Sequence, residues 1–455
     1  MTLFRLIAVA FFACMLSAMP GHAQQRLTAI VGPTIIDGTT EPPIRDGAML
    51  LRDGVIVNVG KRGTFDIPAD AQQLDLTGKT IIPGLIDGHV HPGLIDGMEI
   101  AARNYNYARL QRDARHHLFF GTTHFVSLGF DKQEIFDLRR AQRQGQADGA
   151  RVHMAGHGFA PIGGWRTPVS HEATNDEDWY NRPPAPPEAR QLVDKEADRH
   201  VDLIKIWVDD LRGTFVKMKP ELSGPIIAAA HERSLPVGAH IVFLEDARAL
   251  VRHDVDFLAH SVRDKEVDDA FVRLALAKGL RYMPTLIQAR YPIDYAEGVP
   301  AYLNDPQLRR IYSDEYLDAL AKANQRRFAT PALAAVKAQY EVAMANMARM
   351  QQAGVPIVAG GDTGVPGRFH GLSIHLEMEL LVKGGLTPLQ AIQAATLNVA
   401  RLYRFNGRYG SLHEGKVADF VVLNGDPTRD ITLTRSIETV WMDGARVNRD
   451  ALTGQ

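Results

Sequence analysis

Short apolar runs separated by turn residues mark both ends of this chain. Between residues 27 and 82 the runs are rich in β-branched side chains, which predicts the strands of a small antiparallel sheet. The same pattern returns beyond Arg408, at 418–423 and 436–442. We therefore expect the two chain ends, 24–82 and 406–455, to build one small β-sandwich domain.

The central part, 83–405, has a different periodicity. Apolar strands, loops, helices and further strands follow one another in regular order, and such repeats favour a parallel (β/α)8 barrel of the TIM type, so the fold class is α/β. Two helical stretches are well marked. Thr387 and Pro388 form a helix start before a helix over 389–402, and the Ala-rich segment 305–352 is predicted to be largely helical.

Composition excludes several classes of protein. Of 455 residues, 45% are hydrophobic and 23% charged, and 51 Lys+Arg balance 53 Asp+Glu to a formal charge of -2. This is the composition of a globular protein with a large core. Without an excess of positive charge or a dense basic run, we expect no nucleic-acid partner.

The first 23 residues have the pattern of a cleaved signal peptide. Arg5 precedes an apolar run over 6–16, and Gly21, His22 and Ala23 form a small-residue cleavage site. We therefore expect a secreted or periplasmic protein, with no later stretch that spans a membrane. Cys14, the sole cysteine, lies in this segment, so the chemistry of the mature chain must come from His, Asp, Glu and Lys.

A His-x-His pair follows the apolar strand at 81–86. Residues two apart on a strand point to one side, so His89 and His91 converge at the strand's carboxyl end. Two imidazoles on one face make half of a zinc-type site. Taken alone, the pair is better explained by a structural or surface role.

Lys205 lies in a strand, 201–208, whose two faces are both apolar, which predicts a buried amine. A buried ammonium is costly unless it is paired or neutralised. One explanation is an ion pair with a carboxylate. The other is reaction of the neutral amine with carbon dioxide, which gives a carbamate whose two oxygens can bridge two metal ions.

Three further residues lie at the carboxyl ends of predicted strands, where barrel enzymes have their active sites. His240 and His260 each end a predicted strand, and Asp362 follows an apolar strand that gives way to glycines. Each has an alternative structural explanation, as a hydrogen-bonded core imidazole or as a helix cap.

With these six residues in this order, the chain resembles the amidohydrolase superfamily. The segments 83–92 and 414–423, at either end of the predicted barrel, also look like those of the family. The resemblance implies that His89, His91 and Asp362 hold the more buried of two divalent ions, expected to be zinc. His240 and His260 would hold the other, and N6-carboxylated Lys205 would bridge both. A mononuclear site is the alternative within the fold. A hydroxide bridging the metals would attack the substrate, and Asp362 would act as general base and then general acid.

Within the superfamily, the chain looks most similar to the imidazolonepropionase-like group, which includes Xaa-Pro-type dipeptidases. The similarity rests on the ligand order, on His157 with its flanking glycines and on 375–380. Val242 stands where some of these dipeptidases have a Tyr that helps to bind substrate, and 207–210 replaces a small Gly-rich segment. The resemblance therefore indicates a related hydrolase whose substrate is not fixed.

We expect hydrolysis of the amide (C–N) bond of a dipeptide or N-acyl amino acid, a small-molecule substrate, by a homo-oligomer. A cyclic amide, a lactone or an organophosphate is an alternative substrate, and a non-catalytic periplasmic binding protein is the alternative from another class. His157 is a candidate catalytic residue near the oxyanion. The candidate substrate-binding residues are Trp165, Arg166, Arg290, Tyr291, Arg368 and His370.

Overall fold

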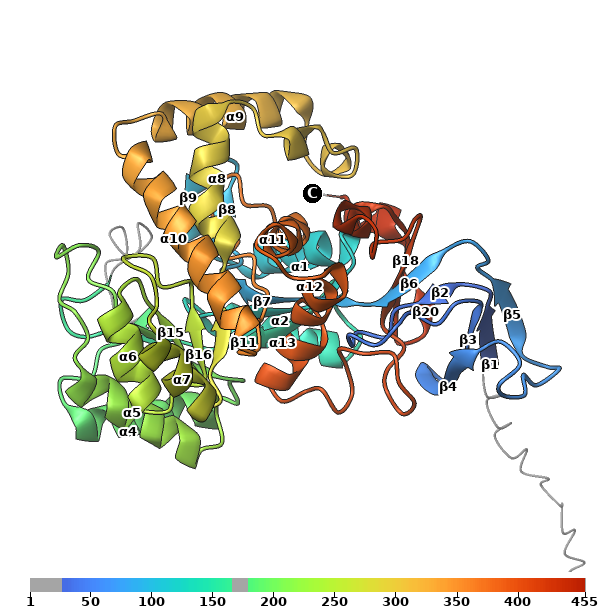
Figure 1. The fold of residues 1–455 in the computed structure, drawn as a ribbon, viewed down its shortest axis with the longest axis horizontal. Helices are drawn as coiled ribbons and strands as arrows, with labels where there is room; N and C mark the ends of the chain where they lie inside the picture. The colour runs from blue at the N-terminus through green and yellow to red at the C-terminus, as the bar shows by residue number, and fades with distance from the viewer. Residues whose placement is uncertain (1–26, 166–178, 455) are drawn as a thin grey trace, which may run out of the picture.

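The computed structural model describes residues 27–165 and 179–454. The predicted signal peptide and Arg166 therefore lie outside the described residues. The fold is of the TIM-barrel type, with a β-rich part attached on one side (Figure 1). None of the described helices is long and apolar enough to cross a membrane.

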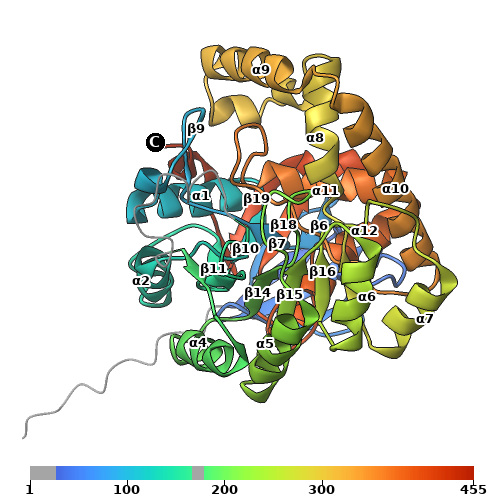
Figure 2. The same ribbon diagram turned by 90° about the vertical axis from the view of Figure 1, so that its left-hand side faces the viewer.

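Parallel strands form the centre of the larger part, and helices surround them (Figure 2). The strands are buried on both faces, as parallel strands covered by helices must be. Hydrogen bonds order them as β11-β10-β7 and as β12-β14-β15-β16-β17, with the short β13 beside β12. Their bounds are β7 (Leu85–Val90), β10 (Thr122–Ser127), β11 (Arg151–Met154), β12 (Gly158–Phe159), β13 (Tyr180–Asn181), β14 (Ile204–Trp207), β15 (Val237–His240), β16 (Phe257–Ala259) and β17 (Arg281–Met283).

The extended segment 356–362 lies between β17 and β7. Tyr282 N–H donates to Pro356 O at 3.0 Å, and on the other side Gly88 N–H donates to Ala359 O at 3.2 Å. Asp362 N–H continues this row to His89 O at 2.7 Å. The two ends of the parallel array are thus joined through one backbone segment, which brings Asp362 beside the His-x-His strand.

Helices alternate with the strands and cover them. They are α1 (Tyr107–Phe119), α2 (Gln133–Arg143), α4 (Pro186–Asp198), α5 (Pro220–Glu232), α6 (Leu244–Arg252), α7 (Asp269–Ala277), α8 (Leu286–Glu297), α11 (Leu372–Lys383), α12 (Pro388–Ala394) and α13 (Leu397–Leu402). α12 starts at the predicted residue, with a capping box between Thr387 and Gln390. The predicted helix over 389–402 breaks at Ala395 and Thr396, where the Thr396 hydroxyl donates to Ile392 O.

The stretch 305–352 is largely helical, as predicted, but it is divided. α9 (Asp314–Phe328) and α10 (Leu333–Gln352) form a hairpin that stands with α8 above the mouth of the strands (Figure 1). Pro331 lies in the break, and a proline inside a continuous helix would lose a hydrogen bond and clash with the preceding turn.

Both chain ends contribute to the β-rich part. β6 (Thr80–Pro83) pairs antiparallel with β18 (Phe420–Leu423), so residues more than 300 apart share a sheet. The region has two sheets, ordered β4-β3-β1-β5 and β2-β6-β18-β19-β20, and one apolar cluster contains residues of both, Ile30 and Phe420 among them. The other bounds are β1 (Leu27–Val31), β2 (Thr34–Ile35), β3 (Gly47–Arg52), β4 (Val55–Lys61), β5 (Gln72–Asp75), β19 (Ile437–Met442) and β20 (Ala445–Arg446).

The prediction that the N-terminal strands are antiparallel was wrong for two pairs, because β1 and β5, and also β2 and β6, run parallel. The residues between β4 and β5 return the chain to the start of the sheet, a crossing that local alternation does not encode. The sandwich architecture and the boundaries at 24–82, 83–405 and 406–455 stay predictions.

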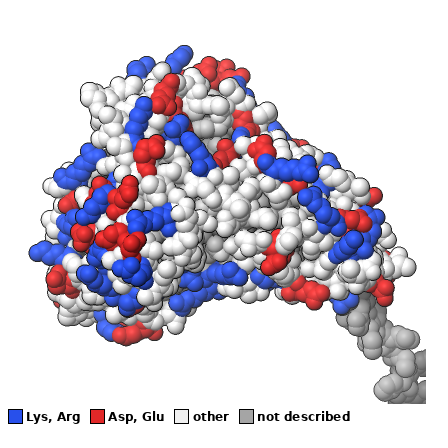
Figure 3. Space-filling view, viewed as in Figure 1, with Lys and Arg blue, Asp and Glu red and all other residues white. Residues whose placement is uncertain are grey.

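Acidic and basic side chains are intermixed on the face drawn in Figure 3. This agrees with the nearly balanced charge of the sequence. On this face no field of one sign extends over the surface, so local contacts determine the electrostatics of the candidate site.

Candidate metal centre

His89, His91 and Asp362 bring their ligand atoms together at the ends of two adjacent segments. His89 Nε2 and His91 Nε2 lie 3.3 Å apart, and they lie 3.3 and 3.5 Å from Asp362 Oδ1. Gly360 makes this approach feasible, because a Cβ atom there would lie only 2.7 Å from His89 Cβ. These three residues form a group that could hold a metal ion.

His240 and His260 join the group from the ends of β15 and β16. Their ring centroids are 4.6 Å apart, and the His260 ring is 5.0 Å from that of His89. His260 and Asp362 both have left-handed backbones, with φ of 77° and 44°. Non-glycine residues rarely adopt this conformation, and such strain concentrates at functional sites.

Lys205, on β14, has a buried amine without a stabilising partner. Its side chain is 1% exposed, and Nζ has no hydrogen-bond acceptor among the described residues. Burial lowers the pKa of Lys205 to about 7, so a large share of the amine is neutral near neutral pH. The ion-pair explanation is not supported, because no carboxylate of the described residues lies within ion-pair distance of Nζ. The Trp207 ring lies 5.4 Å from it.

All four imidazoles are held in the neutral form that binds metals. Burial is the largest cause of the lowered pKa of His89, His91, His240 and His260, and the positive charge of Lys205 lowers each pKa further. Lys205 lies one strand away from His240, because β14 pairs with β15 and places Trp207 opposite His240.

The donor set fits a metal centre. Nδ1 of His89 and Nδ1 of His260 have no hydrogen-bond partner within the described ranges, although both atoms are buried. Buried polar atoms are normally satisfied, so unpaired imidazole nitrogens and an unpaired amine beside a carboxylate need an explanation. A bound cation would supply the missing interactions.

Two carboxylates behind the ligands were not identified as functional from the sequence. Asp87 Oδ1 accepts hydrogen bonds from His89 N–H and Gly361 N–H, at 3.1 and 2.7 Å, and so ties the two ligand-bearing segments together. Asp209 Oδ2 lies 3.4 Å from His240 Nε2. The sequence signal for Asp87 is its position two residues before His89, and Asp209 has no comparable signal.

Asp209 is positioned to orient His240. A carboxylate that accepts the Nε2 proton leaves Nδ1 as the lone-pair donor and fixes the ring. Asp209 is itself buried and held by Leu211 N–H, which donates to Oδ1 at 3.0 Å. Both oxygens of Asp209 are therefore held in place, Oδ1 by Leu211 and Oδ2 by His240.

We expect Asp209→Asn to weaken zinc binding at His240 and His260 by about 10- to 100-fold, because loss of such a partner has that effect on metal sites. The measurement is zinc titration of the full chain against a chromogenic chelator. Asp210→Asn is the matched control, because Asp210 pairs with Lys217, 3.9 Å away, rather than with His240. Equal zinc affinity in Asp209→Asn and the unchanged protein would refute the positioning role.

The candidate substrate-binding residues occupy different environments. The Trp165 ring lies 4.9 Å from the His240 ring, so it borders the metal cluster. Arg368 Nη1 donates to Asp362 Oδ2 at 2.5 Å, and its guanidinium lies over the Tyr291 ring. Two of the candidates thus contact the cluster directly, Trp165 at His240 and Arg368 at Asp362. Tyr291 is linked to it through Arg368.

Two other candidates have their own partners. His370 Nδ1 lies 2.8 Å from Thr363 Oγ1, and its Nε2 lies 3.3 Å from Asp113 Oδ2. Arg290 pairs with Asp294 on the same helix, at 2.6 Å. These contacts give His370 a place beside the Asp362 segment, whereas Arg290 contacts Asp294 on α8 and the Tyr340 ring on α10.

His157 faces α4. Its Nδ1 is 3.7 Å from Glu196 Oε1, and burial lowers its pKa to about 4. The imidazole is therefore neutral at neutral pH. The catalytic role near the oxyanion stays a prediction.

Residues 80–447 match the Amidohydrolase family. Ochratoxinase of Aspergillus niger is 26% identical over 460 aligned positions, which cover 92% of this chain and 86% of the relative. Imidazolonepropionase of Brevibacillus brevis is 24% identical and covers 84% of each chain. The crystal structure of a Xaa-Pro dipeptidase with bound methionine superposes with a TM-score of 0.73, covering 92% of this chain and 99% of that one at 22% identity.

These matches confirm the predicted superfamily and the prediction that the protein is an enzyme rather than a non-catalytic binding protein. They extend over both chain ends as well as the strands that carry the histidines. The protein belongs to the Amidohydrolase family and is a hydrolase of carbon–nitrogen bonds.

Proposed function

We propose that this protein is an exported, binuclear metal-dependent amidohydrolase that cleaves the amide bond of a dipeptide or an N-acyl amino acid. The observation that carries this proposal is the buried, unpartnered amine of Lys205 beside four neutral imidazoles and a carboxylate. A lysine in that position is costly as a structural element. Conversion to an anionic carbamate between two cations removes the cost.

The ligands divide into two sets. His89, His91 and Asp362 would hold one divalent ion, expected to be zinc, and His240 and His260 would hold the other. The neutral amine of Lys205 can attack carbon dioxide, with loss of one proton, to give the carbamate that would bridge the two ions. When bound, two such ions would lower the pKa of a water molecule and polarise a substrate carbonyl.

Asp362 is the residue that would move the proton. Its carboxylate would accept a proton from the attacking water and pass it to the departing amine nitrogen, which balances the hydrolysis of the C–N bond. Arg368 holds Oδ2 of Asp362 at 2.5 Å and thereby orients the carboxylate. Oδ1, which faces the histidines, is the oxygen on the reactive side.

The names of the relatives support hydrolysis of amide bonds but differ in substrate. Imidazolonepropionase is named for a cyclic substrate, whereas the dipeptidase is named for Xaa-Pro peptides. The similarity to imidazolonepropionase favours a cyclic amide as the second candidate. Lactones and organophosphates remain alternatives that the same donor set would serve.

The proposal is tested on purified mature protein with its metals quantified. We expect about two divalent ions per chain, as in two-metal hydrolases. Hydrolysis of dipeptides or N-acyl amino acids should be lost on chelation and restored by zinc. Cyclic amides, lactones and organophosphates complete the panel, and turnover confined to one of them would replace the proposed substrate class. Fewer than about one ion per chain would contradict the two-metal scheme.

A further inference from the structure

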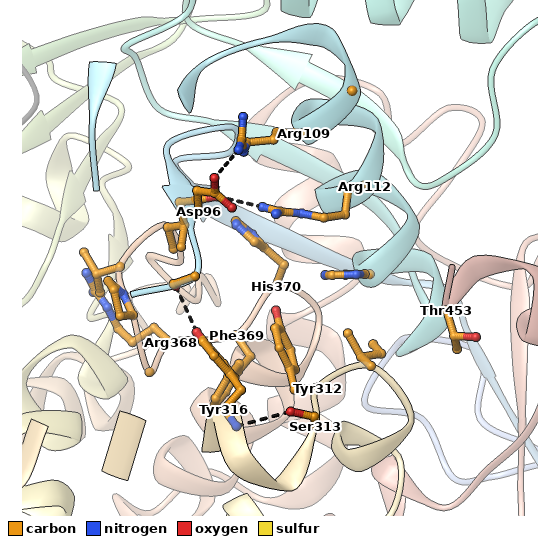
Figure 4. Close-up of a pocket in the computed structure, with 18 of the residues that line it drawn as sticks. Asp96, Arg109, Arg112, Tyr312, Ser313, Tyr316, Arg368, Phe369, His370 and Thr453 are labelled. Atoms are coloured by element: carbon orange, nitrogen blue, oxygen red, sulfur yellow. Dashed lines mark hydrogen bonds and ion pairs between the residues drawn. The ribbon is translucent and has the colours of Figure 1, made fainter. Parts of the chain in front are cut away.

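A cavity of about 620 Å³ is lined by Arg368, which contacts Asp362, but by none of the histidines of the metal-ligand cluster. Figure 4 shows the residues that line it. Its walls come from α1, from the hairpin of β8 (Ile95–Asp96) and β9 (Glu99–Ile100), from the start of α9 and from the loop 365–370. This volume is within the range of small-molecule sites. Two of these walls, the β8–β9 hairpin and the loop 365–370, belong to the segments that follow β7 and Asp362.

One wall is cationic. Arg109, Arg112 and Arg368 line the cavity, and Asp96 is the one carboxylate among its lining residues. Arg109 pairs with Asp96. Arg112 uses Nε and Nη2 to bind Asp113 and Ile95 O, and its Nη1 makes no hydrogen bond to the described part of the chain. Each guanidinium is paired with a carboxylate, that of Arg112 with Asp113 and that of Arg368 with Asp362. The open donor Nη1 of Arg112 is therefore the group that suits an anion.

The opposite wall is aromatic. The Tyr312 and Tyr316 rings stack at 5.2 Å with an angle of 21°, and the Phe369 ring lies 5.1 Å from Tyr312 (Figure 4). The Tyr316 hydroxyl donates to Gly97 O at 3.1 Å, which fixes this ring against the β8–β9 hairpin. Such a surface favours a flat apolar group.

Arg368 joins the cavity to the reactive carboxylate. It lines the cavity, and its Nη1 lies 2.5 Å from Asp362 Oδ2. A ligand that fills the cavity therefore lies one side chain away from Asp362. An amide nitrogen that extends past Arg368 would meet the carboxylate proposed to give it a proton.

We propose that this cavity binds the amino-acid half of the substrate, as a carboxylate with an aromatic or bulky apolar side chain. Arg112 binds the carboxylate, and Tyr312 and Phe369 contact the side chain. The inference rests on the proposed amide hydrolysis and narrows its substrate class to derivatives of apolar amino acids that have a free carboxylate.

The test is binding of 3-phenylpropanoate to the full mature chain, as purified and after chelation, by calorimetry. Propanoate lacks the ring and 3-phenylpropanamide lacks the charge. We expect 3-phenylpropanoate to bind more tightly than either in both protein samples, because the proposed metal ligands are outside the cavity. Equal affinity for the carboxylate and the amide would overturn the proposal.

Arg112→Gln should weaken binding of 3-phenylpropanoate by about 10-fold or more, the loss expected for a hydrogen bond to a charged group. Arg115→Gln is the matched control on the same helix, because Arg115 pairs with Asp148 and does not line the cavity. It should change the Kd by less than about twofold, as surface ion pairs contribute little.

A second variant, Tyr312→Leu, keeps the proposal testable if Arg112→Gln does not fold. It should reduce the preference for 3-phenylpropanoate over propanoate by about 3- to 10-fold, the contribution of an aromatic contact. Unchanged binding in the folded variants would refute the assignment. If metal-dependent hydrolysis is present and binding of the probe is absent, the cavity proposal fails alone; if binding is present without hydrolysis, the proposed function fails alone.

Discussion

Lys205→Met is expected to lower amide hydrolysis by about 10³-fold or more and to reduce the number of bound metal ions. Methionine has similar length but cannot form a carbamate, so the proposed bridge between the two ions is lost. A loss of several kcal/mol of transition-state stabilisation, which a metal ion typically supplies, corresponds to about that factor in rate. The rate is measured with the best substrate of the panel, and the metals are quantified on the same sample.

The same variant separates a functional lysine from a structural one. An unpartnered buried amine opposes folding, so in metal-free protein Lys205→Met should be at least as stable to urea as the unchanged chain. A marked loss of stability would indicate a structural ion pair instead. Full activity with unchanged metal content would refute the carbamate.

Lys217→Met is the matched control for this experiment. The Lys217 amine is partly exposed and lies 2.8 Å from Asp246, so its charge already has a partner. Its activity and metal content should stay unchanged. Labelling with ¹³C-bicarbonate gives a direct readout, since a carbamate signal should be present in the unchanged chain and in Lys217→Met and missing from Lys205→Met.

Asp362→Asn is expected to reduce kcat by about 10²- to 10⁴-fold, the contribution of a general acid–base residue. Asparagine keeps an oxygen near His89 and His91 but cannot take up the proton. Metal content is measured in parallel. A fall in kcat with at least one ion still bound would assign the loss to proton transfer, whereas a proportional loss of metal and activity would make Asp362 a ligand alone.

The variant also has a predictable cost in stability. Arg368 is 8% exposed and pairs with Asp362, and removing one partner of a buried ion pair leaves an uncompensated charge. Urea unfolding therefore has to accompany the kinetics. Asp264→Asn, in an exposed carboxylate that accepts from Leu244 N–H, should change neither kcat nor metal content. Activity near that of the unchanged chain in Asp362→Asn would exclude the proposed proton transfer.

Local patterns in the sequence were sufficient to predict many elements. Alternation placed Lys205 in a buried strand, and the Thr387–Pro388 pair located the start of α12. The order of strands and histidines pointed to one superfamily, because side chains at the carboxyl ends of parallel strands meet at one mouth. The family match confirms that reading.

Contacts between distant segments were not predictable in the same way. Glu377, on α11, accepts hydrogen bonds from Leu286 N–H and Ile287 N–H, and so caps α8 from about 90 residues away. Thr285, the residue at the helix start, makes no side-chain cap of its own. Asp209 beside His240 is a similar case, since neither residue's local sequence specifies the other as its partner.

The sequence by itself determined the strand periodicity, the start of α12 and the set of side chains with the chemistry to bind metal, because these depend on residue type and near neighbours along the chain. The tertiary structure decided that Lys205 has no partner, that Arg368 holds Asp362, and that arginines and aromatic rings enclose a cavity beside them. Those features depend on burial and on distances between segments far apart in the chain, and packing alone fixes both quantities.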